Sequence, residues 1–167
     1  MLDNVAWRAM TGYDPAKVFA IANRVHPGFF EAEAVLAERQ ALYPHGCYVL
    51  EVGEAAAGYV LSHPWPRGEA PALNRLLGAL PEAADSYYLH DLALLPLVRG
   101  IGAAGTIVAA LEKHARARGF AGMSLVAVNG SAGFWGRHGF VPEVGAALAD
   151  KLTGYGADAQ FMRKPLA

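Results

Sequence analysis

The chain of 167 residues is 54% hydrophobic and 17% charged and carries a formal net charge of −1, a composition that excludes an intrinsically disordered chain. No block of like charge occurs along it, so the charge pattern does not indicate binding to a nucleic acid or to an anionic membrane surface. The length favours a single domain spanning residues 1–167, which is long enough to bury a core.

The cysteine content and the N-terminal segment indicate the cellular compartment of the protein. The single cysteine, Cys47, excludes an intramolecular disulfide and fits a reducing compartment, and we expect it to act as a small buried hydrophobe. Residues 1–10 lack the basic and apolar regions of a signal peptide, and no apolar run approaches the ~20 residues of a membrane span. We therefore expect a cytoplasmic protein.

The first half of the chain predicts a strand, two helices and a β-hairpin. In chain order these are a strand at 5–10, helices at 14–25 and 27–43, and strands at 47–52 and 55–63. Asp14 and Pro15 are typical N-cap and first helical residues. Gly53 and Glu54 supply the turn between the two later strands.

The second half alternates helices and strands. Its predicted elements are a short helix at 72–80, a strand at 86–95, a long helix at 102–118, a strand at 122–128, a short helix at 131–139, and strands at 140–144 and 159–166. Pro96 ends the first of these strands, and Glu112 and Arg116 form an i,i+4 pair on the long helix. Because alternation is confined to this half, we expect a mixed sheet rather than a parallel one.

A glycine-rich turn precedes the long helix, with the sequence RGIGAAG at residues 99–105. From Gly100 it matches the G-x-G-x-x-G fingerprint of dinucleotide-binding folds. That interpretation needs a strand ending at the first glycine and an acidic residue after the next strand. Here residues 96–99 intervene, and the next strand is followed by Asn129 and Gly130. An NAD-binding oxidoreductase is therefore disfavoured.

The same turn, read from Arg99, is Arg-x-x-Gly-x-Ala, a different phosphate-binding signature. The first N–H groups of a helix have no partners, and together with the helix dipole they form an anion site. Gly100 and Gly102 let the backbone approach a phosphate closely, and Arg99 adds a fixed positive charge. An ordinary tightly packed loop is the alternative for these residues alone.

Five pieces follow one another between residues 89 and 140: LALLP, RGIGAA, a helix, SLVAVN and SAGFWGRHGF. In this order and spacing they resemble the acetyl-CoA-binding core of the GNAT-type N-acetyltransferases, whereas residues 1–85 match in element order only. The resemblance implies an α/β (α+β) fold with a mixed, mostly antiparallel central sheet flanked by helices. It also implies that the strands at 86–95 and 122–128 splay apart so that a thioester can pass between them.

The resemblance implies a set of CoA contacts. The pyrophosphate is expected on the turn and the first helical residues, and the pantetheine arm is expected to pair with the backbone near Leu94 and Leu95. Asn129 is an expected contact, although a plain turn residue is the alternative. The implied CoA-binding residues are Leu94, Leu95, Arg99, Gly100, Ile101, Gly102, Ala103, Ala104, Gly105, Asn129 and Trp135.

Direct acetyl transfer to an amine requires a base, because an alkyl ammonium of pKa ~10.4 must lose a proton before it attacks. Asp91 is the first candidate, since a carboxylate within an apolar strand has a raised pKa and can relay a proton through water. A structural Asp bound to backbone N–H groups is the alternative. His90 is the second candidate, and strand alternation predicts that the two side chains point to opposite faces.

The general acid departs from the pattern of the family. Members usually carry a tyrosine directly after the aromatic residue of SAGF, and this chain has Trp135 there. An indole N–H cannot usefully protonate a thiolate, so we interpret Trp135 as a wall for the pantetheine. Tyr155 is a candidate replacement, with a surface loop residue as the alternative. A thiol of pKa ~8.5 is also an adequate leaving group as its thiolate, without protonation by an acid.

The amine is expected to contact the segments that vary within the family, which here are residues 26–30, 62–69 and 86–91. An aromatic-lined pocket is predicted from Phe29, Phe30, Trp65, Tyr87 and Tyr88, each of which is otherwise an ordinary core residue. The histidines show no metal-ligand spacing, so we expect no metal.

The sequence therefore predicts an acetyl-CoA-dependent N-acetyltransferase that acts on a primary amine of a small molecule or peptide. GNAT-like domains often pair through their sheet edges, so a homodimer is possible. The alternative is an acyl-CoA-binding regulatory domain without catalysis, which the missing tyrosine allows.

Overall fold

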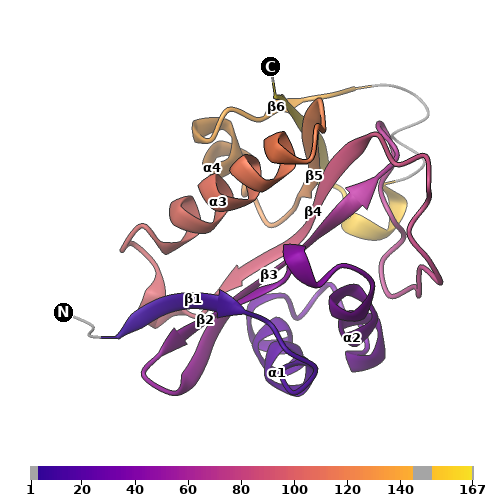
Figure 1. Cartoon of the computed structure of the whole chain (residues 1–167). Coiled ribbons are helices and arrows are strands. Elements are labelled where there is room, and N and C mark those ends of the chain that lie inside the picture. The colour runs from indigo at the N-terminus through magenta and orange to yellow at the C-terminus, as the bar shows by residue number, and fades with distance from the viewer. Residues whose placement is uncertain (1–3, 145–151, 167) are drawn as a thin grey trace.

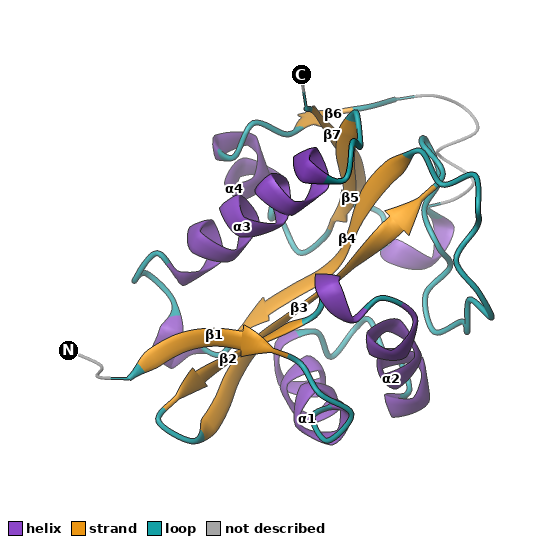
Figure 2. Ribbon diagram, viewed as in Figure 1, coloured by secondary structure: helices purple, strands orange, loops and turns teal. Residues whose placement is uncertain are grey.

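The computed structural model describes residues 4–144 and 152–166. Within these residues seven strands form one sheet in the order β1-β2-β3-β4-β5-β7-β6, and helices cover both of its faces (Figures 1 and 2). The strands are β1 (Val5–Ala9), β2 (Tyr48–Val52), β3 (Ala55–Trp65), β4 (Ser86–Leu94), β5 (Gly122–Ala127), β6 (Val141–Pro142) and β7 (Gln160–Pro165). The helices are α1 (Pro15–Val25), α2 (Glu33–Leu42), α3 (Ala103–Ala117) and α4 (Ala132–Arg137), with 3-10 turns η1 (Pro44–Gly46), η2 (Pro96–Val98) and η3 (Thr153–Tyr155).

The sheet is mixed and mostly antiparallel, which confirms the predicted fold class. β4 and β5 are parallel, and the other neighbouring strands pair antiparallel. Alternate residues of each strand face different helix layers, because strand side chains have a period of two. On β3, Tyr59 and Leu61 pack with α1 and α2, whereas Val60 packs against α3.

Two predicted helices differ from the structure. The second helix begins at Glu33 and not at residue 27, because Pro27 and Gly28 interrupt the helical pattern and residues 26–32 form a loop. The predicted helix at 72–80 is absent. In that segment Asn74 and Gly78 have positive φ angles of 55° and 76°, which a right-handed helix does not accommodate. The Glu38 carboxylate accepts hydrogen bonds from the backbone N–H groups of this segment instead.

A β-bulge in β4 changes which residues face the site. Leu61 pairs with Asp91 and the next residue of β3, Ser62, pairs with Leu89, so His90 is an extra residue opposite β3. The bulge breaks the alternation, so the side chains of His90 and Asp91 both contact the segment 26–32 that follows α1. The prediction that they point to opposite faces is wrong for this reason.

The two middle strands separate soon after they meet. Within the described residues, β4 and β5 share two register pairs, Tyr87 with Met123 and Tyr88 with Ser124. Beyond these pairs the two strands diverge towards their carboxyl ends (Figure 1). Helix α3 follows β4 in the chain. This is the splay that the resemblance predicted, and it opens a space in the middle of the sheet.

The carboxylate of Asp14 ties α1 to β1. The residue occupies the N-cap position, but its side chain makes no cap hydrogen bond, contrary to the usual role of Asp there. It accepts hydrogen bonds from both terminal nitrogens of Arg8, at 2.7 and 2.8 Å, and from the N–H of Thr11 at 2.8 Å. The hydrogen bonds from Arg8 outweigh the effect of burial and lower the pKa of Asp14 to about 2.

An Asp14→Asn variant is expected to lose about 2 kcal/mol of unfolding free energy at neutral pH, because a buried charged hydrogen-bond network is broken. A depressed folded-state pKa contributes stability above the ordinary value of 3.8 that is lost as the pH falls through about 2. Chemical denaturation at several pH values should therefore show a smaller acid dependence between about pH 4 and pH 2 in the variant than in the wild type. Exposed Asp158 provides the control substitution. An unchanged acid dependence in Asp14→Asn contradicts the assignment.

Candidate active site

A cavity of about 1050 Å³ occupies the space opened by the splay. The end of α1 with its following loop, β4, the turn before α3, the end of β5 and α4 all contribute to its wall. The predicted site residues that line it are Phe29, His90, Asp91, Leu94, Arg99, Gly100, Gly102, Ala103, Ala104, Gly105, Asn129, Trp135 and Tyr155. The turn at 99–105 and both candidate bases therefore share one cavity.

The glycine-rich turn presents the open end of α3 to this cavity. Gly100 and Gly102 have φ angles of 77° and 83°, a left-handed conformation that glycine adopts without strain. Gly102 is the N-cap of α3 and gives no side-chain cap, so the first N–H groups of the helix are available to an anion. A Cβ atom at either glycine would enter open space, as a ligand pocket requires.

Arg99 lies beside this turn with an exposed side chain. Its Nε donates a hydrogen bond to the carbonyl of Leu94 at 2.9 Å, which fixes the stem of the side chain against the end of β4. Ile101 does not line the cavity and is 51% exposed. Arg99 and the helix N-terminus together form an electropositive end of the cavity.

The two leucines at the end of β4 differ in their environment. The N–H of Leu95 donates to the carbonyl of Ala57 at 2.8 Å and its side chain is buried in the core, so Leu95 does not line the cavity. In an antiparallel ladder, alternate residues direct their backbone groups to opposite sides. Leu94, which does line the cavity, therefore has its backbone groups on the side of the gap.

Among the described residues, two side chains and no backbone N–H group bind the carboxylate of Asp91. Its Oδ2 accepts a short hydrogen bond from the hydroxyl of Tyr59, and its Oδ1 lies 3.0 Å from Nε2 of His26. Nδ1 of the same imidazole lies 3.4 Å from Nδ2 of Asn129, which follows β5. His26 thus lies between residues that follow or belong to the two separated strands.

His90 forms a second carboxylate–imidazole pair. Its Nε2 lies 2.7 Å from Oε1 of Glu31, and the exposed fractions of the two side chains are 1% and 6%. Glu31 also accepts a hydrogen bond from the N–H of Asn74 at 3.1 Å. Burial alone raises the pKa of Glu31, but the charge and hydrogen bond of His90 outweigh it, so the pKa is lowered.

Trp135 and Tyr155 are both buried in the wall of the cavity. Trp135 packs edge-on against Phe134 and Phe140, at ring separations of 4.9 and 5.6 Å. Tyr155 is not a surface loop residue: it is 4% exposed, and its hydroxyl donates a short hydrogen bond to the carbonyl of Pro71. Burial raises the pKa of Tyr155 to about 12. Its proton is directed at a backbone carbonyl and not into the gap.

Most of the predicted aromatic pocket does not form. Phe30 is 54% exposed and packs edge-on against Phe19, Trp65 packs on His63, and Tyr87 and Tyr88 are fully buried in the sheet. Of this set Phe29 lines the cavity. The aromatic wall comes instead from Phe29, Phe134, Trp135 and Tyr155.

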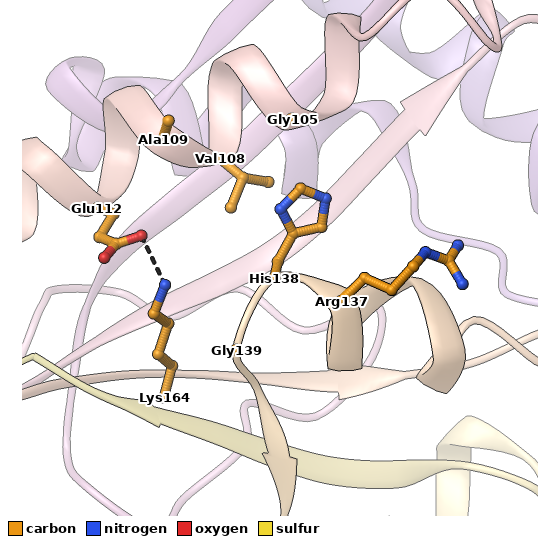
Figure 3. A pocket seen from close by; sticks show the side chains of 8 residues that line it. All are labelled: Gly105, Val108, Ala109, Glu112, Arg137, His138, Gly139 and Lys164. Atoms are coloured by element: carbon orange, nitrogen blue, oxygen red, sulfur yellow. Dashed lines mark hydrogen bonds and ion pairs between the residues drawn. The ribbon is translucent and has the colours of Figure 1, made fainter.

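A smaller cavity of about 400 Å³ adjoins the first and shares Gly105, Arg137 and His138 with it. Figure 3 shows Lys164 directed at Glu112 and Arg137 pointing away from that pair. Lys164 lies 2.9 Å from Glu112, which also pairs with Arg116 at 2.8 Å as predicted. Lys164 and Arg116 thus share the one negative charge of Glu112, whereas Arg137 lines both cavities.

Neither a metal cluster nor a membrane span is found in the part of the chain that the structure describes. No group of three or more His, Cys, Asp or Glu side chains there is placed to hold a metal ion. No helix in the described residues is long and apolar enough to cross a bilayer.

The fold and the cavity define an α/β protein in which an uncapped helix N-terminus opens beside a splayed sheet. A sequence model described as the acetyltransferase (GNAT) family matches residues 16–140, and the chain therefore belongs to that family of acyltransferases. This confirms the resemblance. No curated protein matches the chain significantly.

Solved structures share the fold at low sequence identity. The GphF GNAT-like decarboxylase in complex with isobutyryl-CoA has a TM-score of 0.82 and 16% identity, with coverage of 97% of this chain and 100% of that one. The ribosomal-protein-S18-alanine N-acetyltransferase of Escherichia coli has a TM-score of 0.68 and 16% identity, with coverage of 98% and 94%. Naa50 of Arabidopsis thaliana, in complex with the bisubstrate analogue CoA-Ac-MVNAL, has a TM-score of 0.72 and 11% identity, with coverage of 97% and 99%.

Proposed function

We propose that the protein is an acetyl-CoA-dependent N-acetyltransferase that transfers the acetyl group directly to a primary amine of a small molecule or peptide. One observation carries the proposal: a single cavity joins the open N-terminus of α3 to the carboxylate–imidazole pairs of β4 through the gap in the sheet. We expect the activity in the cytoplasm, because a reducing compartment suits the single buried cysteine.

In the proposed binding mode, CoA runs from the N-terminus of α3 towards Asp91. The pyrophosphate would lie on the N–H groups of residues 102–105, beside the guanidinium of Arg99. An extended pantetheine arm would follow Leu94 along the gap, with Trp135 as its wall. The thioester would then reach the part of the cavity lined by Asp91. Complexes of GphF and Naa50 with a CoA ligand or analogue support this assignment.

The chemistry requires the ammonium of the acceptor to lose a proton and the thioester carbon to accept the amine. The lining near Asp91 supplies carboxylate and imidazole groups for the proton. No acid for the thiolate is needed, because a thiol of pKa ~8.5 is an adequate leaving group. This accounts for Trp135 in the position where the family usually has tyrosine.

Thiol release from acetyl-CoA across a panel of small amines and peptide N-termini tests the proposal. We expect release with at least one acceptor, and we expect CoA but not NAD to raise the melting temperature. Stabilisation by CoA without release for any acceptor would favour a regulatory acyl-CoA-binding domain. A thermal shift with NAD and none with CoA would contradict the proposal altogether.

A further inference from the structure

The imidazole of His26 spans the gap between the two splayed strands. It ends α1, where its backbone N–H donates to the carbonyl of Ala22 at 2.7 Å, so its position is fixed by the helix. Its ring contacts Asp91 of β4 on one side and Asn129 beyond β5 on the other. The side chain lines the main cavity and is 16% exposed, so a ligand can reach it.

We propose that His26 is the catalytic base that takes the proton of the acceptor amine, and that Asp91 is a positioning residue that acts through it. The inference rests on the proposed function. It replaces Asp91 as the first candidate base, and it concerns a residue that the sequence pattern did not single out.

The contacts of the ring select one tautomer. A carboxylate accepts hydrogen bonds, so Nε2 of His26 carries the proton and donates it to Oδ1 of Asp91. Nδ1 is then unprotonated, and the amide nitrogen of Asn129 is a donor at 3.4 Å, a long contact that an ammonium can displace. The lone pair on Nδ1 is therefore the basic site of the pair once the Asn129 contact is displaced.

Asp91 itself is a poor base in this arrangement. One of its oxygens accepts from Tyr59 and the other from His26. Tyr59 is fully buried, and burial with the neighbouring charge of Asp91 raises its pKa well above the ordinary value, so its hydroxyl proton stays in place. A carboxylate with both oxygens engaged orients and stabilises an imidazolium better than it removes a proton.

His90 is less suited to the role than His26. Its exposed fraction is 1%, and its Nδ1 is buried without a hydrogen-bond partner. A substrate ammonium would have to displace protein to reach it. His26 is therefore more accessible than His90. The third imidazole that lines the cavity, His138, packs its ring on Phe134 of α4 and lies near Gly105 of α3.

Neighbouring charges raise the pKa of His26. Burial lowers the pKa of His26, but the hydrogen bond and charge of Asp91 outweigh this effect, and the net direction is upward from 6.5. Glu31, in the loop after α1, adds to the rise, and Arg99, in the turn before α3, opposes it. The raised pKa brings the base closer to that of the ammonium, which favours proton transfer.

Two protons leave the acceptor nitrogen in the proposed step. Nδ1 of His26 takes one proton from R–NH₃⁺, and the imidazolium is stabilised by Asp91. The amine lone pair forms the N–C bond to the thioester carbon, and the C–S bond breaks with its electrons remaining on sulfur. The second amine proton goes to the thiolate, and the imidazolium returns its proton to water.

The pH profile of kcat/KM tests the assignment. The wild type should show an ascending limb above pH 6.5 from His26. His26→Gln should lower kcat by about 10²- to 10³-fold and remove this limb. Asp91→Asn should keep the limb but move it to lower pH, because the carboxylate that raises the pKa of His26 is gone. If Asp91 were the base, the limb would vanish in Asp91→Asn, and the proposal would be overturned.

A matched control is His114→Gln. This imidazole is also hydrogen-bonded, to the Tyr43 hydroxyl at 2.7 Å, and it lines neither cavity described above. The limb should persist in this variant. Persistence of the limb in His26→Gln would overturn the proposal. If His26→Gln fails to fold, the direction of the change in Asp91→Asn decides.

Nuclear magnetic resonance titration of the histidine ring protons separates the two proposals. The resonance of His26 should titrate above pH 6.5 in the wild type and at lower pH in Asp91→Asn. An unchanged midpoint overturns the role of Asp91. A protein that titrates as expected yet releases no thiol with any amine contradicts the proposed function, whereas turnover with an unchanged limb in His26→Gln contradicts only the role of His26.

Discussion

A Gly102→Val variant is expected to lose most of the stabilisation that CoA gives to the wild type. At about a hundred times its dissociation constant, a ligand adds ~2.7 kcal/mol to the unfolding free energy. The added side chain would project into the open space before α3, where the pyrophosphate is expected. Thermal melting with and without CoA measures the effect.

Gly119→Val provides a matched control for the backbone strain. Gly119 has the same φ of 83° and open surroundings, but it follows the opposite end of α3. Both variants should melt lower than the wild type, since a non-glycine residue in the left-handed region costs about 1–2 kcal/mol. Gly119→Val should retain the CoA-induced shift. A full shift in Gly102→Val would place the phosphates elsewhere.

Trp135→Ala is expected to lower the unfolding free energy by about 3–5 kcal/mol, the usual cost of truncating a buried aromatic residue. The ring is 7% exposed and packs on Phe134 and Phe140, so its loss opens a cavity beside the expected pantetheine. In any folded fraction the acetyl-CoA KM should rise. Chemical denaturation and steady-state kinetics measure the two effects.

Trp135→Phe separates packing from proton transfer. Phenylalanine keeps an aromatic wall and removes the indole N–H, so kcat should change by less than about tenfold, or ~1.4 kcal/mol in barrier. General acid–base groups contribute about 10²- to 10⁴-fold. A fall of about a hundredfold in kcat, with KM and folding intact, would show that the N–H has a chemical role and would contradict our account of the missing tyrosine.

Elements with local signals were predicted well. The turn at Gly53 and the long helix ended by Gly119 depend on residues close in sequence, and both are present. The helix predicted at 72–80 is wrong because contacts from α2 compete with it: Glu38 accepts hydrogen bonds from Leu77 and Gly78, about forty residues away. Such contacts leave no periodic signal in the sequence.

The site residues likewise divide into a part that is continuous in sequence and a part that the fold brings together. The glycine-rich turn is a continuous segment, so its residues could be recognised together. The proposed base site joins His26 and Asp91, which are 65 residues apart, and it depends on the bulge at His90. Strand periodicity cannot reveal a bulge, because it assumes that every residue has a partner. His26 lies in the segment 26–30, which was expected to contact the amine, but nothing in the sequence marked its side chain as a base.

In the part of the chain that the structure describes, the separation of β4 from β5 gives the sheet four edges instead of two. β1 and β6 are the outer edges, and the diverging ends of β4 and β5 form two inner ones. An unpaired edge is a template for an added extended chain, and proteins normally protect it. Here the inner edge at Leu94 lines a cavity instead of being covered. An arm with amide groups along an extended chain, as in pantetheine, can complete the ladder, so in the proposed binding mode recognition of the co-substrate would be a form of strand addition.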